Sequence, residues 1–94
     1  MDEMTASGRE SLRVGASAFR AAVLAFEEAR PNAEPSLRRL AGALEKLAHS
    51  YRAAAIETAA RRLAEATPED LRGAIPPLLE ALADFQLART ESHP

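Results

Sequence analysis

The chain lacks or is poor in several residue types, and each shortage excludes a class of site or fold. It contains no cysteine, which rules out disulfide bonds and thiolate metal sites. It has no tryptophan, one tyrosine and three phenylalanines, and β-branched residues are few. Alanine and leucine are abundant instead, and this composition favours helices over strands. No apolar run approaches the length that spans a membrane, so no membrane partner is expected.

The chain also has no excess of basic residues. Lys plus Arg total 12 and Asp plus Glu total 14, for a formal net charge of −2. Two short basic pairs, Arg38–Arg39 and Arg61–Arg62, are each flanked by acidic residues within a few turns. Binding to double-stranded DNA usually needs a clustered basic face. The charge pattern therefore argues against a nucleic-acid partner and favours solvated helix surfaces.

The length of 94 residues is typical of one small domain. We expect a single helical domain over residues 1–94, with flexible tails at about 1–6 and 91–94. The N-terminal residues carry neither the basic region nor the apolar segment of a signal peptide. Together with the lack of a membrane-spanning run, this predicts a soluble, cytoplasmic protein.

Apolar residues recur at helical spacing in three or four segments. The segments predicted to be helical are about Gly8–Arg30, Pro35 or Ser36 to about Arg52, about Ala54–Ala66, and a last one that starts at Thr67–Pro68 and ends near Arg89. In the last segment the apolar phase continues across Pro76–Pro77. Either one kinked helix spans both prolines, or a new helix starts at Pro76.

No glycine or proline marks the boundary between the second and third segments, but their apolar stripes point in different directions. Leu37, Leu40, Leu44, Leu47 and Tyr51 lie on one face, and Ile56, Ala59, Ala60 and Leu63 lie on another. At about 100° per residue, the two faces are roughly 120° apart. Either the chain bends between Arg52 and Ala55, or one long helix packs against different partners along its length.

Amphipathic helices joined by short connections predict an all-α fold, specifically a small antiparallel four-helix up-down bundle. The core is expected where each helix carries its main apolar stripe. The residues predicted to form it are Phe19, Val23, Phe26, Leu40, Leu44, Leu47, Leu63, Leu78, Leu82 and Phe85.

Few residues offer a basis for chemistry. The chain has no glycine-rich phosphate loop, and His49 and His93 are too far apart in sequence to make a good metal site. We therefore expect no metal and no cofactor. His49 lies opposite the leucines of the second segment, and Lys46 precedes it by three residues. Arg52 and Ala53 follow it by three and four residues, the spacing of helix neighbours.

Cations beside an exposed imidazole would stabilise an added phosphoryl group, and a small residue one turn away would let a partner's backbone approach. The pattern around His49 therefore suits phosphoryl transfer. An exposed histidine on an ordinary amphipathic helix explains the same pattern without any function.

Residues 49–55 have the sequence His-Ser-Tyr-Arg-Ala-Ala-Ala. They resemble the motif His-x-x-Lys-Gly-Ser/Ala of the histidine phosphotransfer (HPt) domains of bacterial two-component signalling, and the resemblance covers about Leu37 to Ala88. Those domains are small four-helix bundles with an exposed, phosphorylatable histidine on the second helix. In this alignment His49 is the phosphoacceptor, Arg52 replaces the usual lysine and Ala53 replaces the usual glycine. The third helix is then short.

A second alignment matches Leu37–Leu44 to the run that usually ends in the active histidine, and it continues without gaps to Ala66. It places Gly42 at the active position, followed by Glu45 and Lys46. This alignment implies a degenerate domain that is unable to accept phosphate.

Gly42 and His49 are seven residues apart, so they share one exposed helix face. We predict that this face binds a partner, because small residues keep its surface low and cations complement the acidic pocket of a receiver domain. The predicted binding residues are Gly42, Lys46, Arg52 and Ala53.

The resemblance implies a phosphorelay domain in which His49 accepts a phosphoryl group from an aspartate of a response-regulator receiver domain and passes it on. The imidazole would be the nucleophile, Arg52 would help to hold the phosphate, and Mg²⁺ would belong to the receiver. A histidine kinase is the other implied partner. Such a domain has no independent catalytic site.

Two alternatives stay open. One is a non-catalytic helical interaction module, either a degenerate HPt domain or an unrelated adaptor. The other is a homodimer built on a continuous helix over residues 35–66, similar to a kinase dimerisation hairpin.

Overall fold

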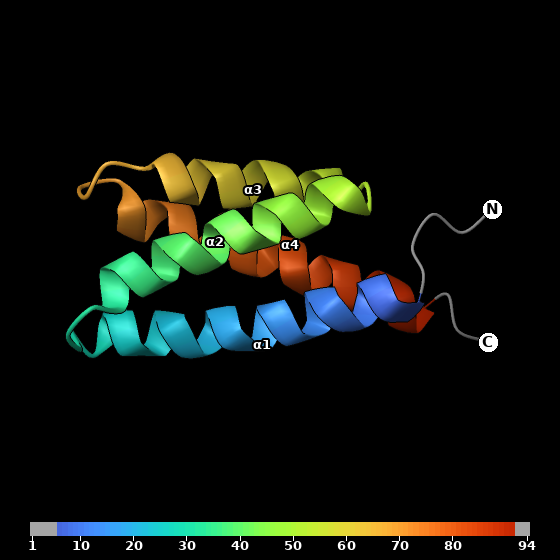
Figure 1. The fold of residues 1–94 in the computed structure, drawn as a ribbon, viewed down its shortest axis with the longest axis horizontal. Helices are drawn as coiled ribbons and strands as arrows, with labels where there is room; N and C mark the ends of the chain where they lie inside the picture. The colour runs from blue at the N-terminus through green and yellow to red at the C-terminus, as the bar shows by residue number, and fades with distance from the viewer. Residues whose placement is uncertain (1–5, 92–94) are drawn as a thin grey trace.

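The computed structural model describes the backbone of residues 6–91 and the side chains of residues 8–85. It contains four helices, which are α1 (Ala6–Glu27), α2 (Ala33–Ser50), α3 (Ala54–Glu65) and α4 (Leu71–Glu91). Successive helices run in opposite directions, and the described residues contain no strand (Figure 1). The predicted all-α antiparallel four-helix bundle is confirmed. The predicted tails lie outside the described residues, except that Ala6 and Glu91 are helical.

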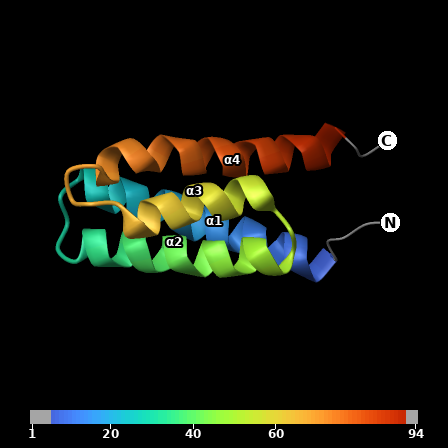
Figure 2. The same ribbon diagram turned by 90° about the horizontal axis from the view of Figure 1, so that it is seen from above.

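Each helix packs against the next one along the chain, and α4 returns to make a lighter contact with α1. The connection between α2 and α3 lies at the same end of the bundle as the start of α1 and the end of α4 (Figures 1 and 2). Within the described residues, no helix combines the length and the apolar character that crossing a membrane requires.

The core is one continuous cluster to which every helix contributes a stripe. Its buried members are Leu12, Ala16, Phe19, Val23, Leu37, Ala41, Leu44, Ala48, Ile56, Ala60, Leu63, Leu71, Ala74, Ile75, Leu78 and Leu82. The prediction was right for Phe19, Val23, Leu44, Leu63, Leu78 and Leu82. Four other predicted residues are only partly buried at the edge of the cluster, namely Phe26, Leu40, Leu47 and Phe85.

On α2 the observed core differs from the predicted one because α1 and α2 pack closely together. The fully covered line on this helix includes Ala41 and Ala48 as well as leucines. A Cβ built on Gly15 of α1 would lie 2.8 Å from Cδ2 of Leu44, which shows how closely α1 approaches α2 at this point. Small residues permit that approach, so the alanines take the centre of the interface and Leu40 and Leu47 cover its flanks.

α1 ends three residues earlier than the predicted Arg30. Ala29 adopts a left-handed conformation with φ of 57°. The N–H of Ala29 donates to the carbonyl of Phe26, and the N–H of Arg30 donates to the carbonyl of Ala25, both at 3.0 Å. These two bonds form a Schellman motif, which satisfies the last carbonyls of the helix and ends it at Glu27, before Pro31 is reached.

The same motif ends α2 and reverses the chain. Arg52 is left-handed with φ of 61°. Its N–H donates to the carbonyl of His49 at 3.3 Å, and the N–H of Ala53 donates to the carbonyl of Ala48 at 2.8 Å. The predicted change of direction near this point is confirmed. A continuous helix over residues 35–66 is therefore wrong, and so is a homodimer built on one.

α4 continues through both of its prolines as a single helix. Pro76 and Pro77 lack the N–H groups that would bond to the carbonyls of Arg72 and Gly73. Both of those residues are exposed, so water can satisfy the two carbonyls. This resolves the open alternative in favour of one helix, whose apolar stripe keeps its phase across the prolines.

Candidate functional site

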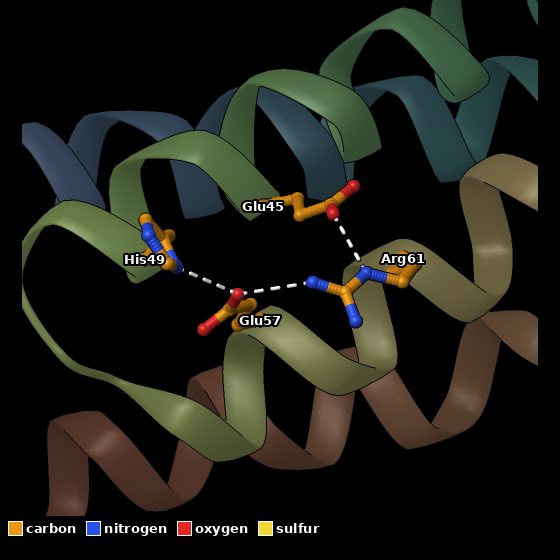
Figure 3. Close-up of polar contacts among 4 residues, drawn as sticks. All are labelled: Glu45, His49, Glu57 and Arg61. Carbon is orange, nitrogen blue, oxygen red and sulfur yellow. Dashed lines mark hydrogen bonds and ion pairs between the residues drawn. The ribbon is translucent and has the colours of Figure 1, made fainter.

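Four polar side chains meet where α2 and α3 pack together, and we call them the α2–α3 cluster (Figure 3). Glu45 and His49 are one turn apart on α2, and Glu57 and Arg61 are one turn apart on α3. Because the helices run antiparallel, the first residue of one pair faces the second residue of the other. The register therefore sets Glu45 against Arg61 and His49 against Glu57.

The cluster is joined by three hydrogen bonds. Nε of Arg61 donates to Oε2 of Glu45 at 2.8 Å, and Nη2 of Arg61 donates to Oε2 of Glu57 at 3.0 Å. The same Oε2 of Glu57 lies 2.9 Å from Nδ1 of His49. One carboxylate oxygen thus serves both the guanidinium and the imidazole, and the guanidinium connects α3 back to α2.

The two carboxylates lie deeper in the surface than the imidazole does. The side chains of Glu57 and Glu45 are 19% and 27% exposed, whereas that of His49 is 77% exposed. The hydrogen bond and the charge of Glu45 raise the pKa of the Arg61 guanidinium, and the charges of Glu57 and Glu65 add to this effect. The guanidinium therefore keeps its charge, and it balances two partly covered carboxylates.

The contact with Glu57 decides which nitrogen of His49 is free to react. A carboxylate accepts hydrogen bonds, so a neutral imidazole must carry its proton on Nδ1 to make this contact. The lone pair then belongs to Nε2, which makes no hydrogen bond or ion pair within the described part of the chain. The arrangement presents a nitrogen nucleophile on an exposed ring whose other nitrogen is hydrogen-bonded to Glu57.

A shallow hollow of about 410 Å³ lies over the cluster, and Lys46 and Ser50 complete its lining. Lys46 is exposed and has no ion pair to any described residue. An anion placed beside His49 would therefore find an uncommitted ammonium group on the same helix. Of the predicted site residues, His49 and Lys46 are brought together here.

Gly42 lies on the same face of α2, outside the hollow. A Cβ built on it would meet nothing within 4 Å, so the surface there is open as well as low. The prediction that Gly42 and His49 share a face therefore agrees with their places on one helix, seven residues apart.

Arg52 and Ala53 are placed differently from the prediction. Both lie beyond the end of α2 at Ser50, so they are not helix neighbours of His49 at i+3 and i+4. Arg52 is exposed in the left-handed turn, and Ala53 is partly buried against the core. The physical reason is the Schellman motif, which the sequence did not signal because neither residue is glycine.

Sequence reasoning missed Glu57 and Arg61 as site residues, and it assigned Glu45 no role at the site. One signal was available, because Glu57 and Arg61 have the i, i+4 spacing of a helical ion pair. Their pairing with α2 depends on the antiparallel register, which becomes definite only once the turn at residues 51–53 is known.

Other kinds of site have less support. Among residues 8–85, no three His, Cys, Asp or Glu side chains gather closely enough to hold a metal ion. A groove of about 570 Å³ runs between α3 and α4, but mostly small side chains such as Ala55, Ala59 and Ala81 line it. Comparison with protein-family models, with curated proteins and with solved structures finds no match to this chain.

Proposed function

We propose that this chain is a phosphorelay domain similar to the HPt domains, in which His49 accepts a phosphoryl group from a receiver aspartate and passes it on. The observation that carries the proposal is the contact between Nδ1 of His49 and Oε2 of Glu57 at 2.9 Å, on a ring that is largely exposed. The contact leaves the lone pair of Nε2 available as the nucleophile.

In the proposed step the Nε2 lone pair forms a P–N bond while the P–O bond of the aspartyl phosphate breaks. The bonding electrons return to the aspartate, which regains its carboxylate. The proton stays on Nδ1, and the positive charge that spreads over the phosphorylated ring is opposed by Glu57. The reverse step passes the group to a second receiver. Any Mg²⁺ needed belongs to the receiver, so the chain itself requires no cofactor.

The charges near His49 act in both directions on a bound phosphoryl group. His49 lies in the last turn of α2, where the exposed carbonyl end of a helix disfavours an anion. The N–H groups of Tyr51, Arg52 and Ala53 already bond to the last carbonyls, which reduces this effect. Lys46 on the helix and Arg52 in the turn supply the positive charge that the added group requires.

The proposed partner is a receiver domain, with a histidine kinase as the source of phosphate further upstream. Receiver domains act in the cytoplasm, so the proposal places this chain there too. Lack of a membrane-spanning helix in the described residues is compatible with that location.

The test is incubation of the purified chain with phosphorylated receiver domains, followed by detection of acid-labile phosphate on the chain. We expect labelling of the wild type and of His93→Gln, and none of His49→Gln. Equal labelling of wild type and His49→Gln, or no labelling across a broad receiver panel, would remove the phosphotransfer function.

A second candidate is a docking module that binds a receiver without chemistry. It is favoured by one observation, the open surface at Gly42 with the unpaired Lys46 one turn along. Gly42→Trp should then abolish receiver binding while Ala43→Trp, an exposed neighbour on the next face, leaves it unchanged. Ala53→Trp is less suitable, although Ala53 is a predicted binding residue, because Ala53 packs against the core.

A further inference from the structure

One carboxylate oxygen of Glu57 accepts from two donors, and the position of the Glu57 side chain therefore depends on Arg61. Nδ1 of His49 and Nη2 of Arg61 both contact Oε2 of Glu57, at 2.9 and 3.0 Å (Figure 3). A glutamate side chain has three rotatable bonds, so a hydrogen bond to an exposed imidazole alone would hold it weakly. A second, independent contact on the same atom restricts it far more.

Arg61 is itself held by a residue of the opposite helix. Its Nε donates to Oε2 of Glu45 at 2.8 Å, and the side chain of Glu45 is only 27% exposed. The planar guanidinium fork offers Nε to one carboxylate and Nη2 to the other, a geometry that a lysine ammonium lacks. The contact thereby ties the position of Glu57 to the backbone of α2, which is the helix that carries His49.

We propose that Arg61, held by Glu45, is a positioning residue that keeps the Glu57 carboxylate on Nδ1 of His49 and so keeps the imidazole in the Nδ1–H form. Only the chemical consequence of this positioning rests on the proposed function. A proton kept on Nδ1 leaves the reactive lone pair on Nε2. Arg61 does not touch the reacting nitrogen. It acts through Glu57, and its removal would leave two partly covered carboxylates with no cation between them.

The tautomer of His49 gives a direct test that needs no phosphotransfer. In ¹⁵N-labelled protein with the background change His93→Gln, long-range ¹H–¹⁵N spectra at a pH where imidazole is neutral report which ring nitrogen carries the proton. We expect the Nδ1–H form to predominate. In Arg61→Ala the ratio of the Nδ1–H form to the Nε2–H form of His49 should fall by about threefold or more, which is the bias expected of one partly exposed hydrogen bond.

Arg62→Ala is the matched control, because Arg62 is the next residue on α3, is exposed, and makes no ion pair with any described residue. It removes the same charge without touching the cluster, so the tautomer ratio should stay at the wild-type value. Arg61→Lys keeps the charge but not the fork, and its ratio should fall as well. A wild-type ratio in Arg61→Ala, or equal changes in Arg61→Ala and Arg62→Ala, would overturn the inference, as would a wild-type ratio in Arg61→Lys.

Receiver-dependent labelling of the same variants separates this inference from the proposed function. A shifted tautomer in Arg61→Ala supports the positioning role even where no variant is labelled, and in that case only the function fails. Labelling of wild type and Arg61→Ala at equal rates with an unshifted tautomer leaves the function in place and refutes the positioning role. Slower labelling of Arg61→Ala than of Arg62→Ala, together with the shifted tautomer, supports both.

Discussion

Gly8 of α1 lies directly against the ring of Tyr51, which begins the turn between α2 and α3. A Cβ built on Gly8 would lie 2.6 Å from Cε1 of Tyr51 and 2.7 Å from Cδ1, closer than real Cβ atoms approach any neighbour. The start of the first helix therefore supports the turn that follows His49, and only a residue without a side chain permits the contact.

Gly8→Ala should displace the ring of Tyr51 and destabilise the fold by about 1–3 kcal/mol, the usual cost of overpacking. Chemical denaturation measures the stability. Tyr51 is the only tyrosine and the chain has no tryptophan, so intrinsic tyrosine fluorescence reports on the surroundings of Tyr51. Gly42→Ala is the control, since the added Cβ meets nothing, and it should stabilise α2 by about 0.5–1 kcal/mol. Equal stabilisation by both changes would show that Gly8 and Tyr51 are not in close contact.

At Ala29, unlike at a mid-helix position, a change to glycine should stabilise the fold. It holds a left-handed conformation at the end of α1, which costs an L-residue with a Cβ roughly 1–2 kcal/mol and costs glycine little. Ala29→Gly should therefore raise the free energy of unfolding by about 1 kcal/mol. Ala21→Gly, an exposed mid-helix position of α1, should lower it by about the same amount. Destabilisation by Ala29→Gly would contradict the Schellman ending.

Arg38 should contribute more to stability than its neighbour Arg39. Its Nη1 donates to the carbonyls of Ala66 at 2.6 Å and Ala64 at 3.3 Å, and so caps the end of α3 from α2. Arg38→Ala should cost about 1–2 kcal/mol, because the side chain is partly buried and the bonds are charge-assisted. Arg39→Ala removes an exposed cation with no ion pair to any described residue and should change stability by less than about 0.5 kcal/mol. Similar costs for both would mean that Arg38 caps nothing in solution.

Two leucines of α2 test the position of the core. Leu44 is 1% exposed at the centre of the stripe, whereas Leu40 is only partly buried at its edge. Leu44→Ala should cost roughly 2–5 kcal/mol and Leu40→Ala clearly less, in equilibrium unfolding. The original sequence prediction treated both as equal core residues. Equal costs would favour that prediction, and a cost for Leu44→Ala below that for Leu40→Ala would contradict the observed packing of α2.

The fold could be predicted because it depends on features that a single sequence displays. Apolar residues at helical spacing indicated three or four helical segments. The shift of the stripe between Tyr51 and Ile56 indicated either a bend or a change of packing partners at a point that no glycine or proline marks. The C-terminal ends of α1 and α2 could not be placed, because Ala29 and Arg52 take left-handed conformations that alanine and arginine rarely adopt. Tertiary packing pays for that strain, and packing is not visible along the chain.

The candidate site was predicted only where it belongs to one helix. Gly42, Lys46 and His49 all belong to α2, so their spacing in the sequence was enough to place them near one another on that helix. Glu57 joins them from α3 through an antiparallel register that depends on the exact residue at which α2 ends. An error of two residues in that end put Arg52 on the helix beside His49 and hid the carboxylate that contacts the ring.

The most direct test of the central claim is the identity of the nitrogen that carries the phosphoryl group. After phosphorylation of ¹⁵N-labelled His93→Gln protein by a receiver, ¹H–¹⁵N and ³¹P spectra distinguish a phosphoryl group on Nε2 from one on Nδ1. Because Glu57 occupies Nδ1 at 2.9 Å, the account predicts phosphate on Nε2 of His49 and a proton retained on Nδ1. Phosphate on Nδ1, or on any residue other than His49, would contradict it.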